Sequence, residues 1–335
     1  MNNKYNSWCK WHPLKTVMLG RSYYPEYYRD IQNPKIKDCL IRIAEETEED
    51  FKNYEKVLKE WGCEVIRPEL DINENLQEQI DTHSGSWYNI RPPAQPRDAQ
   101  LVMGNELLFT NKDHPSIKEK LVEYNSDNIY DLDSRYKFDA CLMTPVGNRV
   151  YIDRKEIPQD VIDSVKEKYP EREFIQVEIG GHTDGCFHTL KPGAIISVNG
   201  RYEQYGETFP DWEVCYLENQ SWSLVEDWSK LKKKNNGKWW LAGEEKNNDF
   251  TDFVETWLTT WVGYCEESVF DVNVLMLDDK TVCVNNYNKQ AFEFFKKHNI
   301  EPIISPFRHR YFWDGGLHCV TLDLNREGEM ENYFE

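Results

Sequence analysis

The stretch Leu101-Val102-Met103-Gly104-Asn105-Glu106-Leu107-Leu108-Phe109-Thr110 contains two short strand-like runs separated by a Gly-Asn pair. Such a pair between two apolar runs is typical of a β-hairpin, because both residues tolerate the backbone conformation of a tight turn. Asn273–Leu277 and Val282–Val284, joined by a polar linker, have the same pattern. Further strand-like runs are Thr16–Gly20, Val150–Ile152, Ala194–Val198 and Cys319–Leu322.

Helical patterns lie between these strand-like runs. The longest is Glu45–Trp61, where apolar residues recur at the three- and four-residue spacing of one helix face. Shorter patterns cover Val161–Lys168 and Asn288–His298. A hairpin, a helix and a further strand thus recur at intervals of tens of residues, which predicts an α/β array. The repeat is too degenerate to give the number of units.

The length and composition favour one large domain. The chain has 335 residues, of which 39% are hydrophobic, enough for a sizeable core. We therefore expect a single domain over residues 1–335. The segment 227–249 differs, since it is rich in Lys, Glu and Asn, and it predicts a solvated surface insertion. The alternative is that its lysines bind phosphate.

The charge and the cysteines restrict the class of protein. The formal net charge is −19, which would repel a phosphate backbone and attract a cationic small substrate, although an acidic surface can also serve solubility alone. No apolar run reaches the length of a membrane span, and no apolar signal segment follows Met1–Lys4. The nine cysteines form no CxxC pair. We expect a cytoplasmic protein with reduced thiols that binds neither nucleic acid nor membrane.

Three polar segments could carry chemistry, namely Gly180–Phe187, Asp314–Thr321 and Pro96–Asp98. Glycines beside polar residues let the backbone approach a ligand closely. His182 and Asp184 are two residues apart, so in an extended segment both would point to the same side. Cys319 follows a Gly-Gly turn and would open a strand at an exposed sheet end.

Taken singly, each of these residues has a structural alternative. A histidine in a turn and a cysteine at a strand are more often structural or core residues than catalytic ones. Metal binding is a further alternative, but the spacing fits no common zinc pattern. The residues considered for it are Cys186, His188, His318 and Cys319.

Six motifs in order along nearly the whole chain resemble the amidinotransferase family, especially the arginine:glycine amidinotransferases, within the pentein superfamily of guanidino-group-modifying enzymes. The resemblance implies an α/β fold, a five-bladed pseudosymmetric propeller of ββαβ-type modules with its site on the central axis. The motifs are Trp11–Gly20; Pro96–Asp98 with Val102–Glu106; Phe138–Ala140; His182–Asp184 with Phe187 and Pro192-Gly193; Asn273–Asp278; and Gly315–Thr321.

The resemblance also implies roles for individual residues. Cys319 matches the nucleophile, His182 the general acid/base and Asp139 the carboxylate paired with that histidine. Asp98 and Asp184 match the acids that grip the guanidinium. The resemblance implies further substrate-binding positions at Arg201, which matches the arginine for the donor's α-carboxylate, at Glu267, near the donor's α-amino-acid end, and at His318.

The implied reaction moves the amidino group of L-arginine to an acceptor amine through an amidino-cysteine, with ping-pong kinetics and no cofactor or metal. Glycine is the default acceptor, giving guanidinoacetate and ornithine. Departures from the family pattern at Ile179–Gly181, Cys141–Met143 and Glu266-Glu267 lie near substrate-recognition positions and leave the acceptor open. The acids at Glu266 and Glu267 could face an ammonium or lie in solvent. The alternatives are hydrolysis of arginine to citrulline and a non-catalytic guanidine-binding protein. A homodimer is considered as the assembly.

Overall fold

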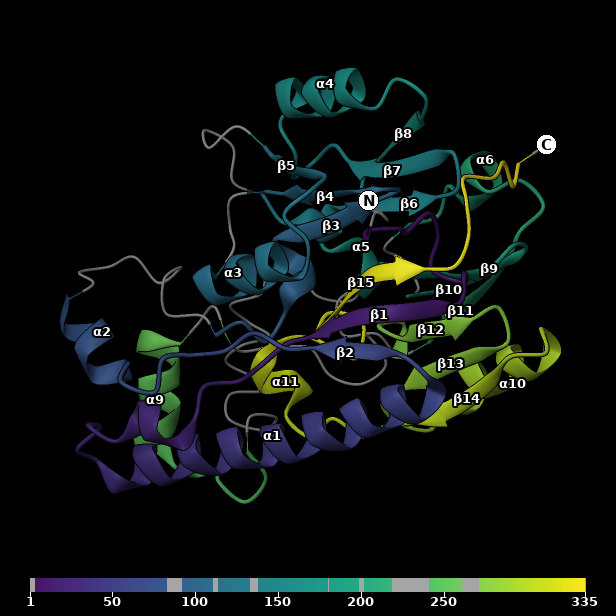
Figure 1. Ribbon diagram of the computed structural model, residues 1–335. Helices are drawn as coiled ribbons and strands as arrows, with labels where there is room; N and C mark the ends of the chain where they lie inside the picture. Colours follow the sequence, from purple (N-terminus) through teal and green to yellow (C-terminus); the bar gives the residue numbers. More distant parts are fainter. Residues whose placement is uncertain are drawn as a thin grey trace.

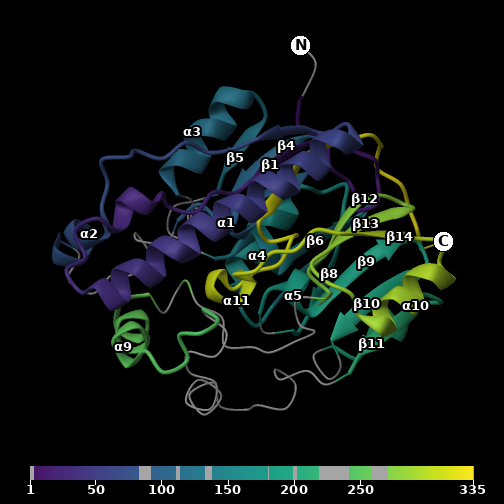
Figure 2. The same ribbon diagram turned by 90° about the horizontal axis from the view of Figure 1, so that it is seen from below.

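The computed structural model describes residues 4–82, 92–110, 114–132, 138–179, 181–198, 202–218, 241–258, 261 and 271–334. Within these residues the strands form five separate three-stranded sheets. The sheets surround the middle of the molecule, and the longer helices lie on the outside (Figures 1 and 2). The predicted fold of five α/β modules is confirmed.

In each sheet the central strand pairs antiparallel with one neighbour and parallel with the other. In the first, β1 (Leu14–Leu19) is followed by helix α1 (Pro34–Trp61) and then by β2 (Glu64–Ile66), which pairs parallel to β1. The third strand, antiparallel to β1, is β15 (Thr321–Arg326) from the far end of the chain. In Figure 1 this yellow strand lies beside the purple β1, so their pairing closes the ring.

The other four modules have the same order along the chain: a hairpin, a helix and a strand parallel to the second hairpin strand. The second module consists of β3 (Gln100–Met103), β4 (Glu106–Phe109), α3 (Pro115–Tyr124) and β5 (Ile129–Asp131). The third consists of β6 (Met143–Val146), β7 (Arg149–Asp153), α4 (Gln159–Lys168) and β8 (Glu173–Val177), and the fourth of β9 (Phe187–Lys191), β10 (Ala194–Val198), α6 (Tyr205–Thr208) and β11 (Glu213–Leu217). The fifth consists of β12 (Leu275–Asp278), β13 (Thr281–Val284), α10 (Lys289–Lys297) and β14 (Glu301–Ile304).

Shorter segments connect these modules or precede their strands. They are η1 (Pro25–Tyr28), α2 (Leu76–Thr82), η3 (Pro96–Asp98), η4 (Ala140–Leu142), α5 (Thr183–Cys186), α9 (Asn248–Trp257) and α11 (Arg310–Trp313). No helix among the described residues combines the length and the apolar character that crossing a membrane needs.

Helix α1 is longer than its predicted pattern, since it begins at Pro34 and not at Glu45. The side chain of Asn33 accepts a hydrogen bond from the backbone N–H of Lys35, and proline is well suited to the first helical position. The buried face continues into this early part, where Ile36 and Leu40 join the core. At the other end Gly62 has a φ of 101°, a conformation that favours glycine and ends the helix.

The two shorter predicted helices are confirmed with small shifts of their bounds, as α4 and α10. Asn288 is the N-cap of α10, where its side chain accepts from the N–H of Ala291. Of the predicted insertion, residues 227–240 lie outside the described residues. Within 241–249, Leu241 is buried against the core that includes α1, and the side chain of Asn247 donates to the carbonyl of Lys35.

A buried charge network ties the last strand to the rest of the ring. Asp323 on β15 accepts from Arg97 of η3 at 2.6 Å and from Arg326 at 2.7 Å, and all three side chains are almost fully buried. Arg326 also donates to the carbonyls of His12 and Met276. Burial alone would raise the pKa of Asp323, but the two guanidiniums hold it well below its usual range.

We expect Asp323→Asn to destabilise the fold by about 3–5 kcal/mol, because two buried guanidiniums lose their shared counter-charge. Urea denaturation at pH 7 measures this. The carboxylate's stabilisation is present above the usual aspartate pKa and is lost as pH falls through the depressed folded pKa, so the gap to wild type should shrink in acid. Glu327→Gln, which removes an exposed partner of Lys15, is the control and should leave stability unchanged. Equal stability of the Asp323 variant and wild type would contradict this account.

Candidate active site

The segments that carry the polar motifs occupy the same place in each module, immediately before the first hairpin strand. Segment η3 precedes β3, η4 precedes β6, and α5 precedes β9. Asn273 precedes β12, and the turn with Cys319 precedes β15. Because the modules are arranged in a ring, five equivalent positions meet near its centre. This brings together residues that are far apart in the sequence.

His182 lies between two carboxylates at this centre. It is the N-cap residue of α5, and its Nε2 is 3.3 Å from Oδ2 of Asp139 while its Nδ1 is 3.9 Å from Oδ1 of Asp98. Burial would lower the pKa of His182, but the carboxylates of Asp98 and Asp139 outweigh it and raise the pKa to about 9. His182 is therefore an imidazolium at neutral pH and can donate a proton.

Cys319 is held by Asn273. The Asn273 side chain donates to Sγ of Cys319 at 2.9 Å, and its Oδ1 accepts from the backbone N–H groups of His318 and Cys319 at 3.0 and 2.9 Å. Gly316 is required by this close approach, since a Cβ at this position would lie 2.8 Å from the Asn273 side chain. One asparagine thus fixes both the turn and the sulfur.

Asp184 connects Cys319 to His318. Its Oδ2 is 3.4 Å from Sγ of Cys319 and 2.7 Å from Nδ1 of His318. Burial, with the nearby cations Arg97 and Lys10, holds the pKa of His318 well below its usual range, so the ring is neutral and its Nδ1–H donates to Asp184. The other oxygen of Asp184, Oδ1, is buried and has no hydrogen-bond partner within the described part of the chain. It is available to accept from a bound donor.

The electrostatics of the site disfavour a thiolate when no cation is bound. Burial, followed by the charges of Asp184 and Asp98, raises the pKa of Cys319 well above its usual value. A cation placed between these carboxylates would offset their charge and lower the pKa of the thiol. The arrangement can therefore couple the binding of a cationic group to the formation of a nucleophile.

Comparisons with known proteins point to one family. No family model matches the chain. The mitochondrial glycine amidinotransferase of Xenopus laevis is 23% identical over 399 residues, covering 98% of this chain and 84% of that protein. The chain is thus similar to an amidinotransferase over nearly its whole length. Among solved structures, the fold is similar to the inosamine-phosphate amidinotransferase StrB1 of Streptomyces griseus, with a TM-score of 0.71, 15% identity and full coverage of both chains. The amidinotransferase SxtG of Microseira wollei matches with a TM-score of 0.69, 16% identity, and 99% and 100% coverage.

The predicted site residues fall into two neighbouring groups, and the charge of Asp98 in one acts on Cys319 in the other. Asp98, Asp139 and His182 form one group, and Asp184, His318 and Cys319 form the other. Arg201, Glu266 and Glu267 lie outside the described residues, so their predicted roles stay predictions. Of the four residues considered for a metal, His188 packs its ring edge-on against His318 with centroids 4.8 Å apart.

Two expectations from the sequence are wrong. His182 and Asp184 do not point to the same side of an extended segment, because α5 begins at Thr183 and the chain turns between them. His182 faces Asp139, whereas Asp184 faces His318 and Cys319. Cys319 does not open a strand at an exposed sheet end, since β15 begins at Thr321 and Cys319 is buried in the preceding turn.

Two residues of the site, Asn273 and Lys10, were missed, and a third, Cys141, was noted only as a departure from the family pattern. Asn273 was noted only as part of a strand motif, and a lone asparagine before a strand gives no catalytic signal. The sequence marked Cys141 by its place directly after a family motif, but gave no sign that its thiol lies 3.9 Å from Asp98. Lys10 is buried and its ammonium has no hydrogen-bond partner among the residues that the structure describes. It lines a cavity of about 30 Å³ with Asp184 and His318, the room of one water molecule. Burial lowers its pKa to about 8 despite the charge of Asp184.

We expect Cys319 to react slowly with iodoacetamide at pH 7, because its raised pKa leaves little thiolate. Asp184→Asn removes a negative charge beside the sulfur, so the pKa should fall and alkylation should become several-fold faster. Peptide mass spectrometry over time measures the modification of Cys319. Asp163→Asn, on the exposed face of α4, is the control and should match wild type. A folded Asp184 variant that reacts no faster would show that this carboxylate does not set the pKa of the thiol.

Proposed function

We propose that the protein transfers the amidino group of L-arginine to an amine through a covalent amidino-cysteine at Cys319. The observation that carries this is the arrangement of one thiol, two buried carboxylates and one imidazolium at the same centre. The similarity of the chain to amidinotransferases along nearly its whole length supports the reaction class. The polar groups fit the reaction of a planar cation with a nucleophile better than they fit a purely structural core.

The carboxylates of Asp98 and Asp184 suit a guanidinium. That group is planar, carries five N–H donors and a delocalised positive charge, and pairs best with carboxylates in a fixed plane. Both side chains are more than nine-tenths buried, so the paired charges would be little screened by water. Asp184 offers its unpartnered Oδ1, while its Oδ2 stays fixed by His318.

The bound cation would then activate the thiol. Its positive charge offsets Asp98 and Asp184, the pKa of Cys319 falls, and the thiol proton leaves to solvent. The thiolate attacks the central carbon of the guanidinium and forms a C–S bond. His182 gives its proton to the departing nitrogen, the C–N bond breaks, and ornithine leaves. The amidino group remains on Cys319, and His182 is now neutral.

The second half of the reaction runs through the same groups. Neutral His182 takes a proton from the incoming amine, whose nitrogen attacks the amidino carbon. The C–S bond breaks, the thiolate is restored and His182 is again an imidazolium. This order requires the first product to leave before the acceptor reacts, which gives ping-pong kinetics.

Glycine is the acceptor we propose first, with guanidinoacetate and ornithine as products. The relatives differ in this respect, because their names refer to glycine in one case and to inosamine-phosphate in another. In this chain Cys141, which lies beside Asp98, and Gly181, which precedes His182, are among the departures from the family pattern. An acceptor screen is therefore the decisive experiment.

We expect wild-type protein with L-arginine and a panel of amines to form ornithine and one guanidino product, read by mass spectrometry. With arginine alone, the intact chain should gain the mass of one amidino group. Cys319→Ala should lose both signals but still bind arginine. The control Cys63→Ala removes a buried cysteine whose thiol donates a hydrogen bond to the carbonyl of Leu14, and it should retain both signals. Citrulline formed without an amine would favour the hydrolase, and arginine binding without any product would favour a non-catalytic binder.

Asp98→Asn should weaken arginine binding by about 10- to 150-fold, because a charge-assisted hydrogen bond is worth about 1.5–3 kcal/mol. Isothermal titration calorimetry in a Cys319→Ala background separates binding from turnover. Asp163→Asn in the same background is the matched control and should bind as tightly as its parent. Unchanged affinity in the Asp98 variant would remove this residue from the guanidinium site.

A further inference from the structure

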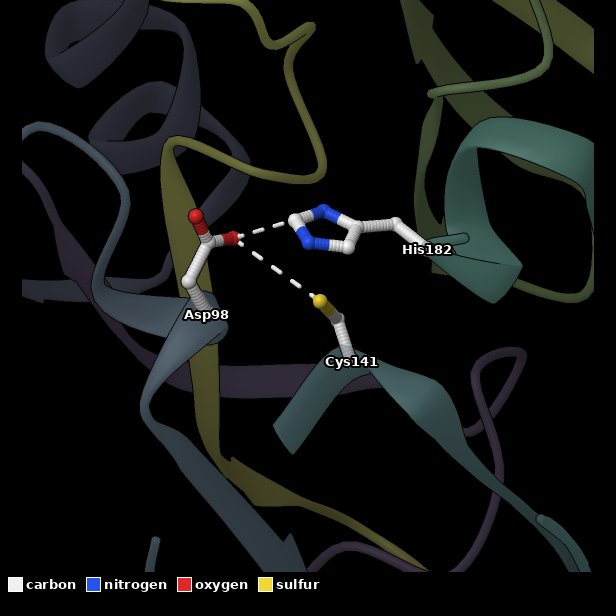
Figure 3. Close-up of side chains that lie close together, drawn as sticks. All are labelled: Asp98, Cys141 and His182. Atoms are coloured by element: carbon white, nitrogen blue, oxygen red, sulfur yellow. Dashed lines mark hydrogen bonds and ion pairs between the residues drawn. The ribbon is translucent and has the colours of Figure 1, made fainter. Parts of the chain in front are cut away.

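Cys141 has no part in the proposed reaction, yet it lies among the residues that carry it. It is the middle residue of η4, and its thiol is buried. Figure 3 shows its sulfur and the ring of His182 both directed at the carboxylate of Asp98. The three side chains come from three different segments of the chain. A thiol, an imidazole and a carboxylate that converge in this way form a set of ligands.

We propose that Asp98, Cys141 and His182 bind a divalent metal ion of the zinc type, and that this ion occupies the place of the substrate guanidinium. The binding of the metal goes beyond the proposed function and does not depend on it. The competition with the guanidinium rests on the proposed function. The two claims can therefore fail separately.

The distances between the three ligand atoms would suit a zinc ion if the side chains moved slightly closer together. Sγ of Cys141 and Nδ1 of His182 are each 3.9 Å from Oδ1 of Asp98, and the three ligand atoms all lie within 4.8 Å of one another. Tetrahedral zinc with bonds of about 2.0–2.3 Å places its ligand atoms roughly 3.3–3.6 Å apart. The two pairs with Oδ1 of Asp98 need to close by less than roughly 1 Å and the remaining pair by roughly 1.5 Å at most, which changes of side-chain torsion can supply.

The chemistry of the ligands selects the type of ion. A thiolate and an imidazole are ligands that Zn²⁺ and Co²⁺ accept well, whereas Mg²⁺ and Ca²⁺ prefer oxygen atoms alone. The charges also balance, because a thiolate and a carboxylate together neutralise a divalent ion. Neutrality is important here, since Asp98 and Cys141 are 6% and 4% exposed and an unbalanced buried charge is costly.

The surroundings of His182 favour its role as a metal ligand. Oδ2 of Asp139 lies 3.3 Å from Nε2 of His182, so Asp139 can hold the ring with Nδ1 facing Asp98. A carboxylate on the far nitrogen of a metal-binding histidine is the usual way in which such rings are oriented. The side chain of His182 is 30% exposed, which gives an ion from solvent a path to the site and leaves room for water as the fourth ligand.

Binding of the metal and of arginine would exclude each other. The proposed reaction needs Asp98 to accept from the guanidinium and His182 to carry a proton. A bound ion would take the same oxygen and the same imidazole. Trace zinc would then inhibit the transfer reaction, and the inhibition would increase with the free concentration of the ion until the site is saturated.

The test uses the full chain and Co²⁺ as a spectroscopic probe, because a thiolate bound to Co²⁺ gives a charge-transfer absorption that oxygen and nitrogen ligands do not give. We expect wild type to bind one Co²⁺ per chain with this absorption and to bind Zn²⁺ in calorimetry. Cys141→Ala should lose the absorption and bind Zn²⁺ at least tenfold more weakly. Cys319→Ala and Cys63→Ala are the controls and should keep both signals, and circular dichroism confirms that each variant is folded.

The outcomes separate the alternatives. Absorption that survives in Cys141→Ala, absorption lost only in Cys319→Ala, or no binding by wild type would each overturn the proposed site. Arginine added to the Cys319→Ala protein should raise the apparent Kd for Zn²⁺. Zinc binding through Cys141 that arginine leaves unchanged would preserve the metal site and contradict the proposed guanidinium site instead.

Discussion

The antiparallel pairing of β15 with β1 is the constraint on which the site depends. It joins two ends of the chain into one sheet and places the turn before β15 at the centre of the ring. Without this pairing Cys319 would have no fixed position relative to His182, which comes from another module. The ion pairs of Asp323 with Arg97 and Arg326 strengthen the same junction, and Arg97 also donates to the carbonyl of His318, the neighbour of Cys319.

The charges at the centre explain how such a buried site can be both stable and reactive. With no ligand bound, the thiol of Cys319 is neutral and the imidazolium of His182 balances part of the carboxylate charge. In the proposed reaction a bound cation would shift this balance toward the thiolate. The preference for a cation and the activation of the thiol would then have the same physical source, the carboxylates of Asp98 and Asp184.

Local structure was largely predictable from the sequence, but the contacts of the site were only partly so. The hairpins and the buried faces of α1, α4 and α10 follow from apolar periodicity, although α1 extends further toward its N-terminus than the pattern indicated. The number of modules came only from the resemblance, because the repeat is degenerate. The directions of His182 and Asp184 were predicted wrongly. An extended segment would align the two side chains, whereas the start of the short helix α5 between them directs them apart. Asn273, Cys141 and Lys10 acquire their surroundings only from the ring. The cytoplasmic location, the homodimer and the roles of Arg201 and Glu267 stay predictions.

Ring closure between β1 and β15 has a consequence for how the protein is made. The two strands are separated by almost the whole chain, so their pairing carries a large loop-closure entropy and is expected to form late. During synthesis β1 leaves the ribosome long before its partner and presents an unpaired edge that could pair with other chains. Because Cys319 directly precedes the closing strand, a nascent chain has no thiol at this site until the edge of β1 is about to be covered.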